Sequence, residues 1–561
     1  MNDARGKVPI RQLPTGVPGL DAVLGGGLPE YSFNLIAGAP GSGKTTLAQQ
    51  ILFANGSPGL PSLYFTVLGE SPLKVLRYQQ QFGFFDPAKM DEAVRFINLS
   101  REVMEQDLKG VLESIVREVE SASPGIVVVD SFRALARKAA ADRGGMELEE
   151  FVQRLALHLT SWQATTFIVG EYGEDEMRNN PLFTLADGLV WLFQSVQRNS
   201  VVRKLQVVKQ RGQEHMPGLH TFRITGEGIQ IFPRSFGLVD KKARPRPLRR
   251  ISTGVPSLDE MLGGGLPAGD SALVAGPAGS GKTALCTQFI AEGIKQGEPG
   301  IIVVFEEDPA EYVSRAETLG LKMEEMIRAE MLKVVYLRPL DLSVDETLHE
   351  VRETVLRIGA QRVVVDSLSG FELALAPAFR EDFRESLYRM VLSLTGIGVT
   401  VLNSVEIVES FHELRFSPHE ISFLTDTILL QRYVEMDGQI QKVLAVVKTR
   451  RGDHSKDLRL YDITPEGLVI GETLREYQGI LTGAPTRRRE AEEPAFPGLT
   501  VPEALVLRTL IELRESPSEE LTRRTGLRPA AQRSALNRLV ALNYALRVME
   551  GGVTLYRSLV V

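Results

Sequence analysis

The chain has 561 residues and a formal net charge of −7, with 43% hydrophobic residues, 24% charged residues and one cysteine. This composition is ordinary for a globular protein and provides apolar material for several domains. The acidic balance excludes a globally basic surface for nucleic acid, and the lone Cys286 excludes an intramolecular disulfide. The N-terminus lacks the apolar core of a signal peptide and the longest apolar runs are strand-sized, so we expect a cytoplasmic protein without membrane spans.

The first motif in the chain is a phosphate-binding loop at residues 38–45, with the sequence Gly-Ala-Pro-Gly-Ser-Gly-Lys-Thr. A strand-like run precedes it and a helical pattern follows it, which is the context that this motif requires. The glycines allow backbone N–H groups to converge on phosphate oxygens, and the lysine reaches the β- and γ-phosphates. The residues expected to bind ATP here are Gly38, Gly41, Ser42, Gly43, Lys44, Thr45 and Thr46.

The same motif returns at residues 276–283. Other segments repeat at a nearly constant spacing, because residues 13–21 return at 251–259 and each is followed by Leu-Gly-Gly-Gly-Leu-Pro. This pattern indicates two copies of one domain. The second set of expected ATP-binding residues is Gly276, Gly279, Ser280, Gly281, Lys282, Thr283 and Ala284.

Each copy alternates strand-like apolar runs with amphipathic helical stretches. In the first copy the spacing predicts strands at 33–37, 62–67, 126–129 and 166–169. This alternation predicts an α/β fold with a mostly parallel sheet that is covered on both faces. Ligands bind such sheets at the carboxyl ends of the strands, and the phosphate loop, Glu70 and Asp130 all fall there.

Acidic residues follow several of these strands. Asp130 and Asp366 each end a Val-Val-Val-Asp run, and we expect them to hold Mg²⁺ together with Thr45 and Thr283. Glu306 and Glu307 form a carboxylate pair that can orient and deprotonate a water or hydroxyl for attack on the γ-phosphate. At the matching place the first copy has only Glu70, preceded by Gly69, so we expect the second copy to turn over faster.

A Lys-x-Arg pair and a histidine occur late in each copy, far along the chain from the phosphate loop. Cations of this kind often act on the γ-phosphate of a neighbouring subunit, as an arginine finger does. A pair of solvated surface charges is the simpler alternative. The residues are Lys209, Arg211 and His215 in the first copy and Lys448, Arg450 and His454 in the second.

The last part of the chain differs from both copies. Helices are predicted at 501–513, 518–527 and 530–542, followed by a hairpin of 544–548 and 553–559. Three helices and a hairpin resemble a winged helix-turn-helix, for which DNA binding and a protein contact are both open functions. The third helix offers Gln532, Arg533, Ser534, Asn537 and Arg538 to a ligand.

Segments rich in proline and charge mark the domain limits. We expect domains at 10–240, 251–480 and 499–561, with a basic linker at 241–250 and a second linker at 481–498.

Together the motifs resemble the KaiC family of ATPases with two RecA-like domains. The resemblance covers about residues 10–480 and rests on the twin loops, Phe305-Glu306-Glu307, Asp366-Ser367, Ser422-Phe-Leu-Thr-Asp426-Thr, Tyr433-Val-Glu with Gly438, and Lys448-Thr-Arg450 with His454. It implies a homohexameric double ring with ATP at the subunit interfaces. It also implies ATPase activity and, in the second ring, serine autophosphorylation across the interface with Ser422 as the acceptor.

Three features depart from the family's pattern. Gly69 breaks the carboxylate pair of the first ring. The family's paired phosphosites are a serine and a threonine, whereas Phe423 follows Ser422 in this sequence, which does not support a two-site phosphorylation cycle. The winged-helix-like tail is not part of the clock protein. We therefore expect a signalling or regulatory ring, with regulatory proteins as partners, rather than a timekeeper.

Two other functions stay open at this point. One is a DNA motor or recombinase, since RecA-like folds also do that work. The acidic net charge and the lack of a basic, aromatic-interleaved stripe count against it. The other is an ATP-switched transcription regulator that uses the tail on duplex DNA.

Overall fold

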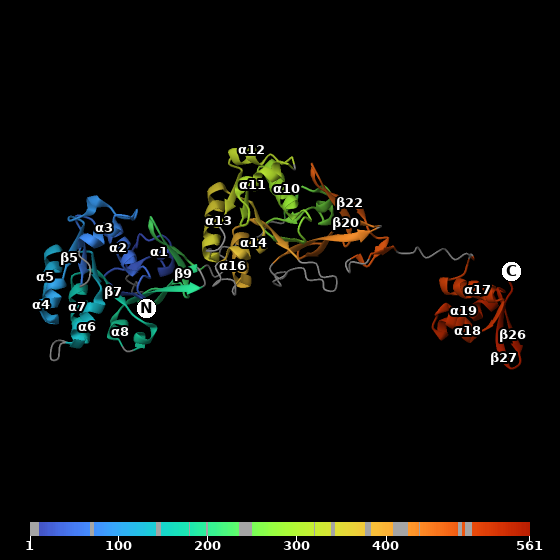
Figure 1. The fold of residues 1–561 in the computed structure, drawn as a ribbon, viewed down its shortest axis with the longest axis horizontal. Helices are drawn as coiled ribbons and strands as arrows, with labels where there is room; N and C mark the ends of the chain where they lie inside the picture. The colour runs from blue at the N-terminus through green and yellow to red at the C-terminus, as the bar shows by residue number, and fades with distance from the viewer. Residues whose placement is uncertain are drawn as a thin grey trace, which may run out of the picture. The chain divides into compact units, whose positions relative to one another are not determined.

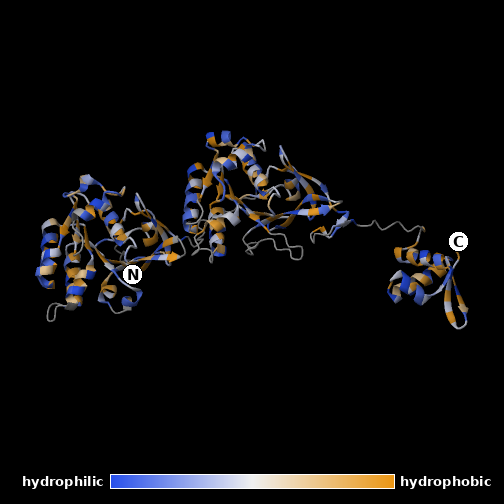
Figure 2. Ribbon diagram, in the orientation of Figure 1, coloured by the Kyte–Doolittle hydropathy of each residue, from blue (hydrophilic) through white to orange (hydrophobic). Residues whose placement is uncertain are grey.

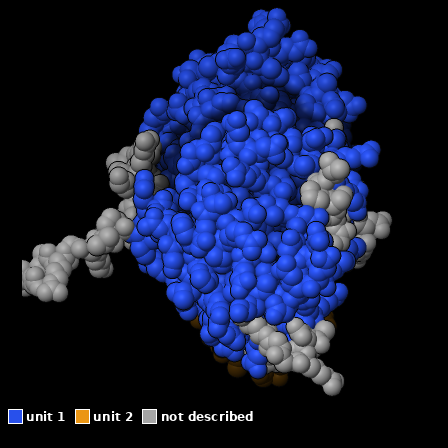
Figure 3. Space-filling view, turned by 90° about the vertical axis from the view of Figure 1, so that its left-hand side faces the viewer, with its two compact units in different colours: residues 1–433, 438–473 blue, residues 434–437, 474–561 orange. Residues whose placement is uncertain are grey.

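The computed structural model describes residues 10–67, 72–141, 147–178, 180–197, 200–234, 249–318, 320–337, 343–375, 383–407, 425–436, 438–480, 485–487, 496 and 498–560. The chain forms two compact units, one of residues 1–433 with 438–473 and one of residues 434–437 with 474–561 (Figure 3). The first unit contains both copies of the repeat, and the second contains the tail (Figure 1).

The first copy is built on a nine-stranded sheet in the order β11-β10-β9-β8-β3-β7-β6-β4-β5. Strands from β5 to β8 in this order pair in parallel, and β8 to β11 pair antiparallel. The strands are β3 (Phe33–Gly38), β4 (Ser62–Thr66), β5 (Val94–Asn98), β6 (Ile126–Asp130), β7 (Thr165–Glu171), β8 (Gly188–Gln197), β9 (Ser200–Gln210), β10 (His220–Thr225) and β11 (Gly228–Phe232).

Helices cover both faces of this sheet (Figure 1). On one face α5, α6, α7 and α8 pack around Val127 and Val129, and on the other α1 and α2 pack around Val128. Because both faces of β6 are buried, its sequence is a continuous apolar run rather than an alternating one. The helices are α1 (Leu20–Leu24), α2 (Lys44–Asn55), α3 (Pro72–Gln79), α4 (Ser100–Glu105), α5 (Leu108–Ala122), α6 (Phe132–Ala141), α7 (Leu148–Ser161) and α8 (Pro181–Leu185).

The second copy has the same topology, in the order β16-β15-β17-β18-β14-β19-β20-β21-β22. The strands are β14 (Ser271–Gly276), β15 (Gly300–Val304), β16 (Leu332–Tyr336), β17 (Arg362–Asp366), β18 (Thr400–Glu406), β19 (Thr427–Met436), β20 (Gln439–Thr449), β21 (Arg459–Thr464) and β22 (Gly467–Thr473). The helices are α9 (Pro256–Met261), α10 (Lys282–Lys295), α11 (Pro309–Glu317), α12 (Met323–Arg328), α13 (Val344–Ile358), α14 (Leu368–Ala374) and α16 (Phe383–Gly396). The predicted α/β fold with two mostly parallel sheets is confirmed.

The repeated segment at the start of each copy forms a small hairpin and a turn. Strand β1 (Gln12–Leu13) pairs with β2 (Leu28–Pro29), and β12 (Arg250–Ile251) pairs with β13 (Leu266–Pro267). Within each hairpin an aspartate accepts hydrogen bonds from a threonine hydroxyl, at 2.6 Å for Thr15 and Asp21 and at 2.7 Å for Thr253 and Asp259. The repeated sequence therefore has a structural role, because it forms the same hairpin and the same hydrogen bond in both copies.

Among its described residues, the second unit contains three helices and a three-stranded sheet in the order β25-β27-β26, and β23 (Tyr477–Gln478) pairs with β24 (Thr486–Arg487) ahead of them. Thr500 and Glu503 form a capping box at its first helix, and Gly526 ends its second helix with a φ of 67°. Its helices alternate apolar and polar residues along their length (Figure 2), and the apolar side chains meet in one core. The elements are α17 (Val501–Leu513), β25 (Glu515–Pro517), α18 (Ser518–Thr525), α19 (Pro529–Ala541), β26 (Ala545–Glu550) and β27 (Val553–Ser558).

One residue of this unit corrects the sequence prediction. Gln532 was expected to face a ligand, but its side chain is fully buried and accepts a hydrogen bond from the Thr525 hydroxyl at 2.9 Å. The reason is that α19 turns this position toward α18. Arg533, Ser534 and Asn537 are exposed, and Arg538 forms an ion pair with Glu503 at 3.4 Å.

Among the described residues, we find no helix with the length and hydrophobicity that crossing a membrane requires.

Candidate nucleotide sites

The phosphate loop of the first copy joins the end of β3 to the start of α2. Gly41 and Gly43 have φ angles of 74° and 100°, which favour glycine, and a Cβ on Gly43 would lie 2.9 Å from Ile224 Cδ1. The buried Lys44 donates from Nζ to the Ala39 carbonyl at 2.8 Å. Burial lowers the pKa of Lys44, and the nearby charges of Glu171 and Asp130 partly offset this effect.

A pocket of about 280 Å³ lies against this loop. Gly38 ends β3 at the base of the loop, and the Ser42 side chain is fully buried, so only the backbone of Ser42 is available to a phosphate. The residues that line the pocket are Gly41, Gly43, Lys44, Thr45, Thr46, Asp130, Ser131, Gly170, Glu171 and Ile224.

The predicted magnesium ligands of the first copy lie together in this pocket. The Thr45 hydroxyl donates to Asp130 Oδ2 at 2.6 Å, and the Tyr64 hydroxyl donates to the same oxygen at 2.6 Å. Burial raises the pKa of Asp130, whereas these hydrogen bonds and the charge of Lys44 lower it. A hydroxyl and a carboxylate next to a phosphate loop are the oxygen ligands that Mg²⁺ prefers, so the residues fit this ion.

The second phosphate loop has the same geometry. Gly279 and Gly281 have φ angles of 74° and 94°. Lys282 Nζ donates to the carbonyls of Gly276 and Pro277 at 2.9 and 2.7 Å, and burial lowers its pKa. Ser280 is fully buried and donates to Gln431, and Ala284 is buried in the first turn of α10, so neither presents its side chain to a ligand.

Asp366 of the second copy also accepts two hydrogen bonds. The Ser404 hydroxyl donates to Oδ1 at 2.5 Å, and the Tyr312 hydroxyl donates to Oδ2 at 3.3 Å. Tyr312 comes from α11, whereas Tyr64 comes from β4, so the two copies direct a buried phenol to equivalent carboxylates, Asp366 and Asp130, from different elements. Sequence reasoning missed both tyrosines, since no motif links them to the loops.

The two predicted catalytic carboxylates of the second copy have different surroundings. Glu307 forms an ion pair with Arg315 at 2.7 Å. Glu306 lies over the start of α14, where a Cβ on Gly370 would be 2.9 Å from its Cγ. Burial, followed by the charges of Glu406 and Asp366, raises the pKa of Glu306. Glu70 and Gly69 of the first copy lie outside the described residues.

Two further glutamates occupy matching places at the strand ends. Glu171 ends β7 beside Gly38, and Glu406 ends β18 beside Gly276, in the parallel register of each sheet. The negative charge of each glutamate raises the pKa of the loop lysine in its own copy and so partly offsets the effect of burial. Sequence reasoning missed this pair, although each is the acidic residue that ends the strand next to the phosphate-loop strand.

The Lys-x-Arg pairs lie at the opposite end of the sheet from the phosphate loop of their own copy. Leu192 of β8 lies beside Gly38, whereas Lys209 lies opposite Leu189 and Arg211 follows the end of β9. At about 3.3 Å per residue, this places Arg211 roughly 15 Å along the strand direction from the loop. Lys209 donates to the Thr184 carbonyl, and Arg211 pairs with Asp187 at 3.1 Å.

The second copy repeats this arrangement. Lys448 donates to the Thr425 carbonyl at 2.9 Å, and Arg450 pairs with Asp426 at 3.6 Å. Burial, followed by the charge of the neighbouring arginine, lowers the pKa of both lysines. His215 and His454 are half-buried in the loops that follow the two pairs. The structure thus brings each predicted loop together with its aspartate, and separates both from the cations of the same copy.

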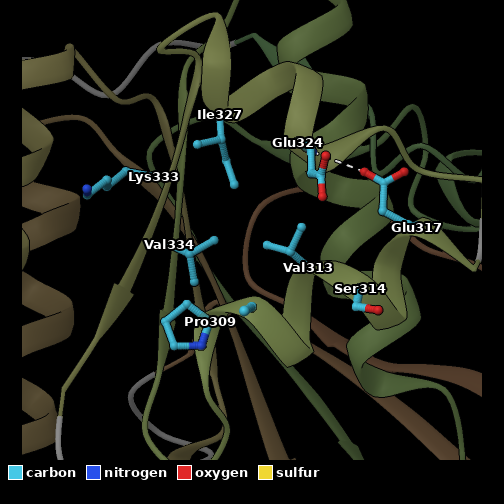
Figure 4. Close-up of a pocket in the computed structure, with 9 residues that line it drawn as sticks. Pro309, Val313, Ser314, Glu317, Glu324, Ile327, Lys333 and Val334 are labelled. Atoms are coloured by element: carbon cyan, nitrogen blue, oxygen red, sulfur yellow. Dashed lines mark hydrogen bonds between the residues drawn. The ribbon is translucent and has the colours of Figure 1, made fainter.

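A groove of about 530 Å³ lies elsewhere in the second copy, between α11, α12 and β16. Val313, Ile327 and Val334 point into it, and Glu317, Glu324 and Lys333 lie around them (Figure 4). None of its lining residues belongs to the phosphate loop, so it is not the nucleotide pocket of this copy.

Ser422 and Phe423, the predicted phosphosite and its neighbour, lie outside the described residues, as does most of each linker.

Two phosphate loops, each opposite a strand-end aspartate on a mostly parallel sheet, define a protein with tandem P-loop nucleotide-binding domains. The model of the KaiC ATPase family matches residues 13–235 and again residues 251–475. The chain belongs to this family, and ATP is the nucleotide that the family implies.

Curated relatives agree with the family match. The chain is 31% identical over 497 residues to the circadian clock oscillator protein KaiC of Rippkaea orientalis, covering 85% of this chain and 92% of the relative. It is also 31% identical to circadian clock oscillator protein KaiC 1 of Synechocystis, over 85% of this chain and 92% of the relative. KaiC of Prochlorococcus marinus is 30% identical over 86% of this chain and 97% of its own length.

Proposed function

We propose that the protein is a regulatory ATPase that works as a homohexameric double ring. In each ring, the phosphate loop of one chain binds Mg-ATP, and the Lys-x-Arg pair of the next chain completes the site. The observation that carries this proposal is the placement of Lys209, Arg211, Lys448 and Arg450 at the sheet end opposite their own loops. A closed ring supplies a neighbour whose loop these cations can reach.

The residues of each site have separate roles in this proposal. Thr45 with Asp130, and Thr283 with Asp366, would hold Mg²⁺, which would supply positive charge to the β- and γ-phosphates. Glu306 takes the proton of the attacking water in the second copy, and Glu70 does so in the first. The half-buried His215 and His454 lie on the cation side of the interface. The proposed domain limits are 10–240, 251–480 and 499–561.

Assembly tests this proposal. With Mg-ATP present, light scattering is expected to give a mass near six chains, because only a closed ring completes every site. The matched control is the chain with Lys209, Arg211, Lys448 and Arg450 all replaced by alanine, which is expected to hydrolyse ATP poorly. A wild-type chain that stays monomeric while it hydrolyses ATP would contradict the proposal.

We further propose that Ser422 is phosphorylated by ATP bound to the second copy of the adjacent chain. A serine hydroxyl is a weak nucleophile until a base removes its proton and the γ-phosphate is held in line. Glu306 supplies the base, Lys282 the phosphate contact, and Lys448 with Arg450 the charge stabilisation. The alternative is that the Ser422 hydroxyl only forms hydrogen bonds within its own loop.

Mixed rings distinguish these cases. One chain carries Ser422→Ala with an intact loop, and the other carries Lys282→Ala with an intact Ser422. After incubation with γ-labelled ATP, label is expected on Ser422 of the second chain, because transfer crosses the interface. Absence of label at Ser422 in both wild-type and mixed rings would end the autokinase proposal.

For the tail we propose a winged helix-turn-helix that binds DNA weakly through phosphates. The exposed Arg533 and Asn537 on α19 support this proposal, whereas the ion pair of Arg538 with Glu503 reduces the free positive charge of that helix. A salt-titrated shift assay with the full chain and with Arg533→Ala tests it. No binding at low salt would leave a protein contact as the function of the tail.

A further inference from the structure

Each copy contains a contact between its glycine turn and the loop that follows its Lys-x-Arg pair. The glycine turn comprises residues 24–28 in the first copy and 262–266 in the second, and the cation loop comprises residues 211–216 and 450–455. In the first copy Gln213 Nε2 donates to the carbonyls of Leu24 and Gly27 at 2.7 and 2.6 Å. The cation loop of this copy therefore holds itself against the glycine turn.

The second copy satisfies the corresponding carbonyls with a residue from another segment. Arg250 Nη1 donates to the carbonyls of Leu262 and Gly265 at 2.8 and 2.7 Å. Its Nη2 donates to the carbonyl of Arg451 at 2.9 Å. One guanidinium thus joins the glycine turn to the cation loop, next to Arg450.

Gly452 makes room for this guanidinium. Its φ is 100°, and a Cβ at this position would lie 2.3 Å from Arg250 Nη2. A side chain at this position would displace the guanidinium, and the positive φ also favours glycine. An ion pair between Arg451 and Asp270, the residue before β14, also holds this loop.

The residue that occupies the place of Arg250 in the first copy has a smaller role. Gln12 begins β1 as Arg250 begins β12, and its Nε2 donates to Gln213 at 2.9 Å and to the Gly25 carbonyl at 3.4 Å. The two short hydrogen bonds to the glycine turn of this copy come from Gln213, not from Gln12. The anchor therefore belongs to the cation loop in the first copy and to the strand that leads into the domain in the second.

We propose that Arg250 is the positioning residue of the second catalytic interface. It holds the cation loop so that Lys448 and Arg450 meet the neighbour's nucleotide, a role that rests on the interface described under Proposed function. Arginine suits the task because its planar, permanently charged fork reaches three carbonyls at once.

Hydrogen exchange and kinetics test this role together. Arg250→Ala is expected to speed amide exchange in residues 450–456 and to leave exchange in α10 unchanged. The turnover number of the second copy, measured in a Glu70→Gln background, should fall about 10- to 100-fold, since small misplacements of a reacting group have effects of this size. Binding of a fluorescent ATP analogue should be unchanged. Arg250→Lys, which retains some of the donors, should give an intermediate turnover number.

The first copy provides matched controls. Gln213→Ala should speed exchange in residues 211–216, whereas Gln12→Ala should have little effect. Unchanged exchange in residues 450–456 of Arg250→Ala would overturn the inference. Faster exchange with an unchanged turnover number would leave the anchor in place but contradict the role of Lys448 and Arg450 in the proposed function. Equal losses of turnover and of nucleotide binding in Arg250→Ala would indicate a general structural role and would also overturn it.

Discussion

Glu306→Gln is expected to lower the turnover number of the second copy by about 100- to 10,000-fold, which is the range that a general base contributes. The glutamine keeps the shape of the side chain but cannot accept the proton of the attacking water. The double variant with Glu307→Gln should lose no more than a few-fold further, because Glu307 is engaged by Arg315. Steady-state ATPase assays of the single and double variants check this prediction.

The pH dependence of the second-copy ATPase activity is a second test of Glu306 as the base. A base works when it is deprotonated, so activity falls as the pH drops through its pKa. Because burial and the charges of Glu406 and Asp366 raise the pKa of Glu306, the acid-side loss should begin at a higher pH than for an ordinary glutamate. Glu406→Gln should move the acid-side loss of activity to lower pH.

If Glu70→Gln abolishes the ATPase activity and Glu306→Gln does not, the roles of the two copies are reversed.

Lys44→Ala and Lys282→Ala should each remove one class of ATP site. Each lysine contributes a charge-assisted hydrogen bond to phosphate worth about 1.5–3 kcal/mol, so the affinity of that site should fall roughly 10- to 150-fold. Equilibrium titration with a fluorescent ATP analogue measures the stoichiometry. The double variant should bind neither class at concentrations that saturate the wild type. Binding at the wild-type stoichiometry would show that the loops are not the sites.

The parallel sheets and their ligand-binding edges follow from local patterns in the sequence. The run before Asp130 is apolar throughout because β6 is buried on both faces, and Asp130 is the residue at which that run reaches the edge. The glycines of each loop mark positive φ angles that other residues disfavour. These features depend on neighbours in the chain, so the sequence predicts them directly.

Contacts between distant segments could not be predicted in this way. Tyr64 donates to Asp130 from a strand in the first copy, whereas Tyr312 donates to the equivalent Asp366 from a helix in the second. Because the two tyrosines do not occupy equivalent positions in the repeat, comparing the two copies does not reveal them. Glu171 and Glu406 meet the loops only through strand register. Gln532 looks like a surface residue by type, yet the packing of α18 against α19 buries it.

The most direct test of the shared site is complementation between two chains that are each inactive at the second-copy site. One chain carries Lys282→Ala, and the other carries Lys448→Ala with Arg450→Ala. In a random one-to-one mixture, about a quarter of the second-copy sites combine an intact loop with an intact neighbouring cation pair. The mixture should therefore regain about a quarter of the second-copy ATPase activity above the background of pure Lys282→Ala rings. An activity equal to the mean of the two separate chains would contradict a site shared between subunits.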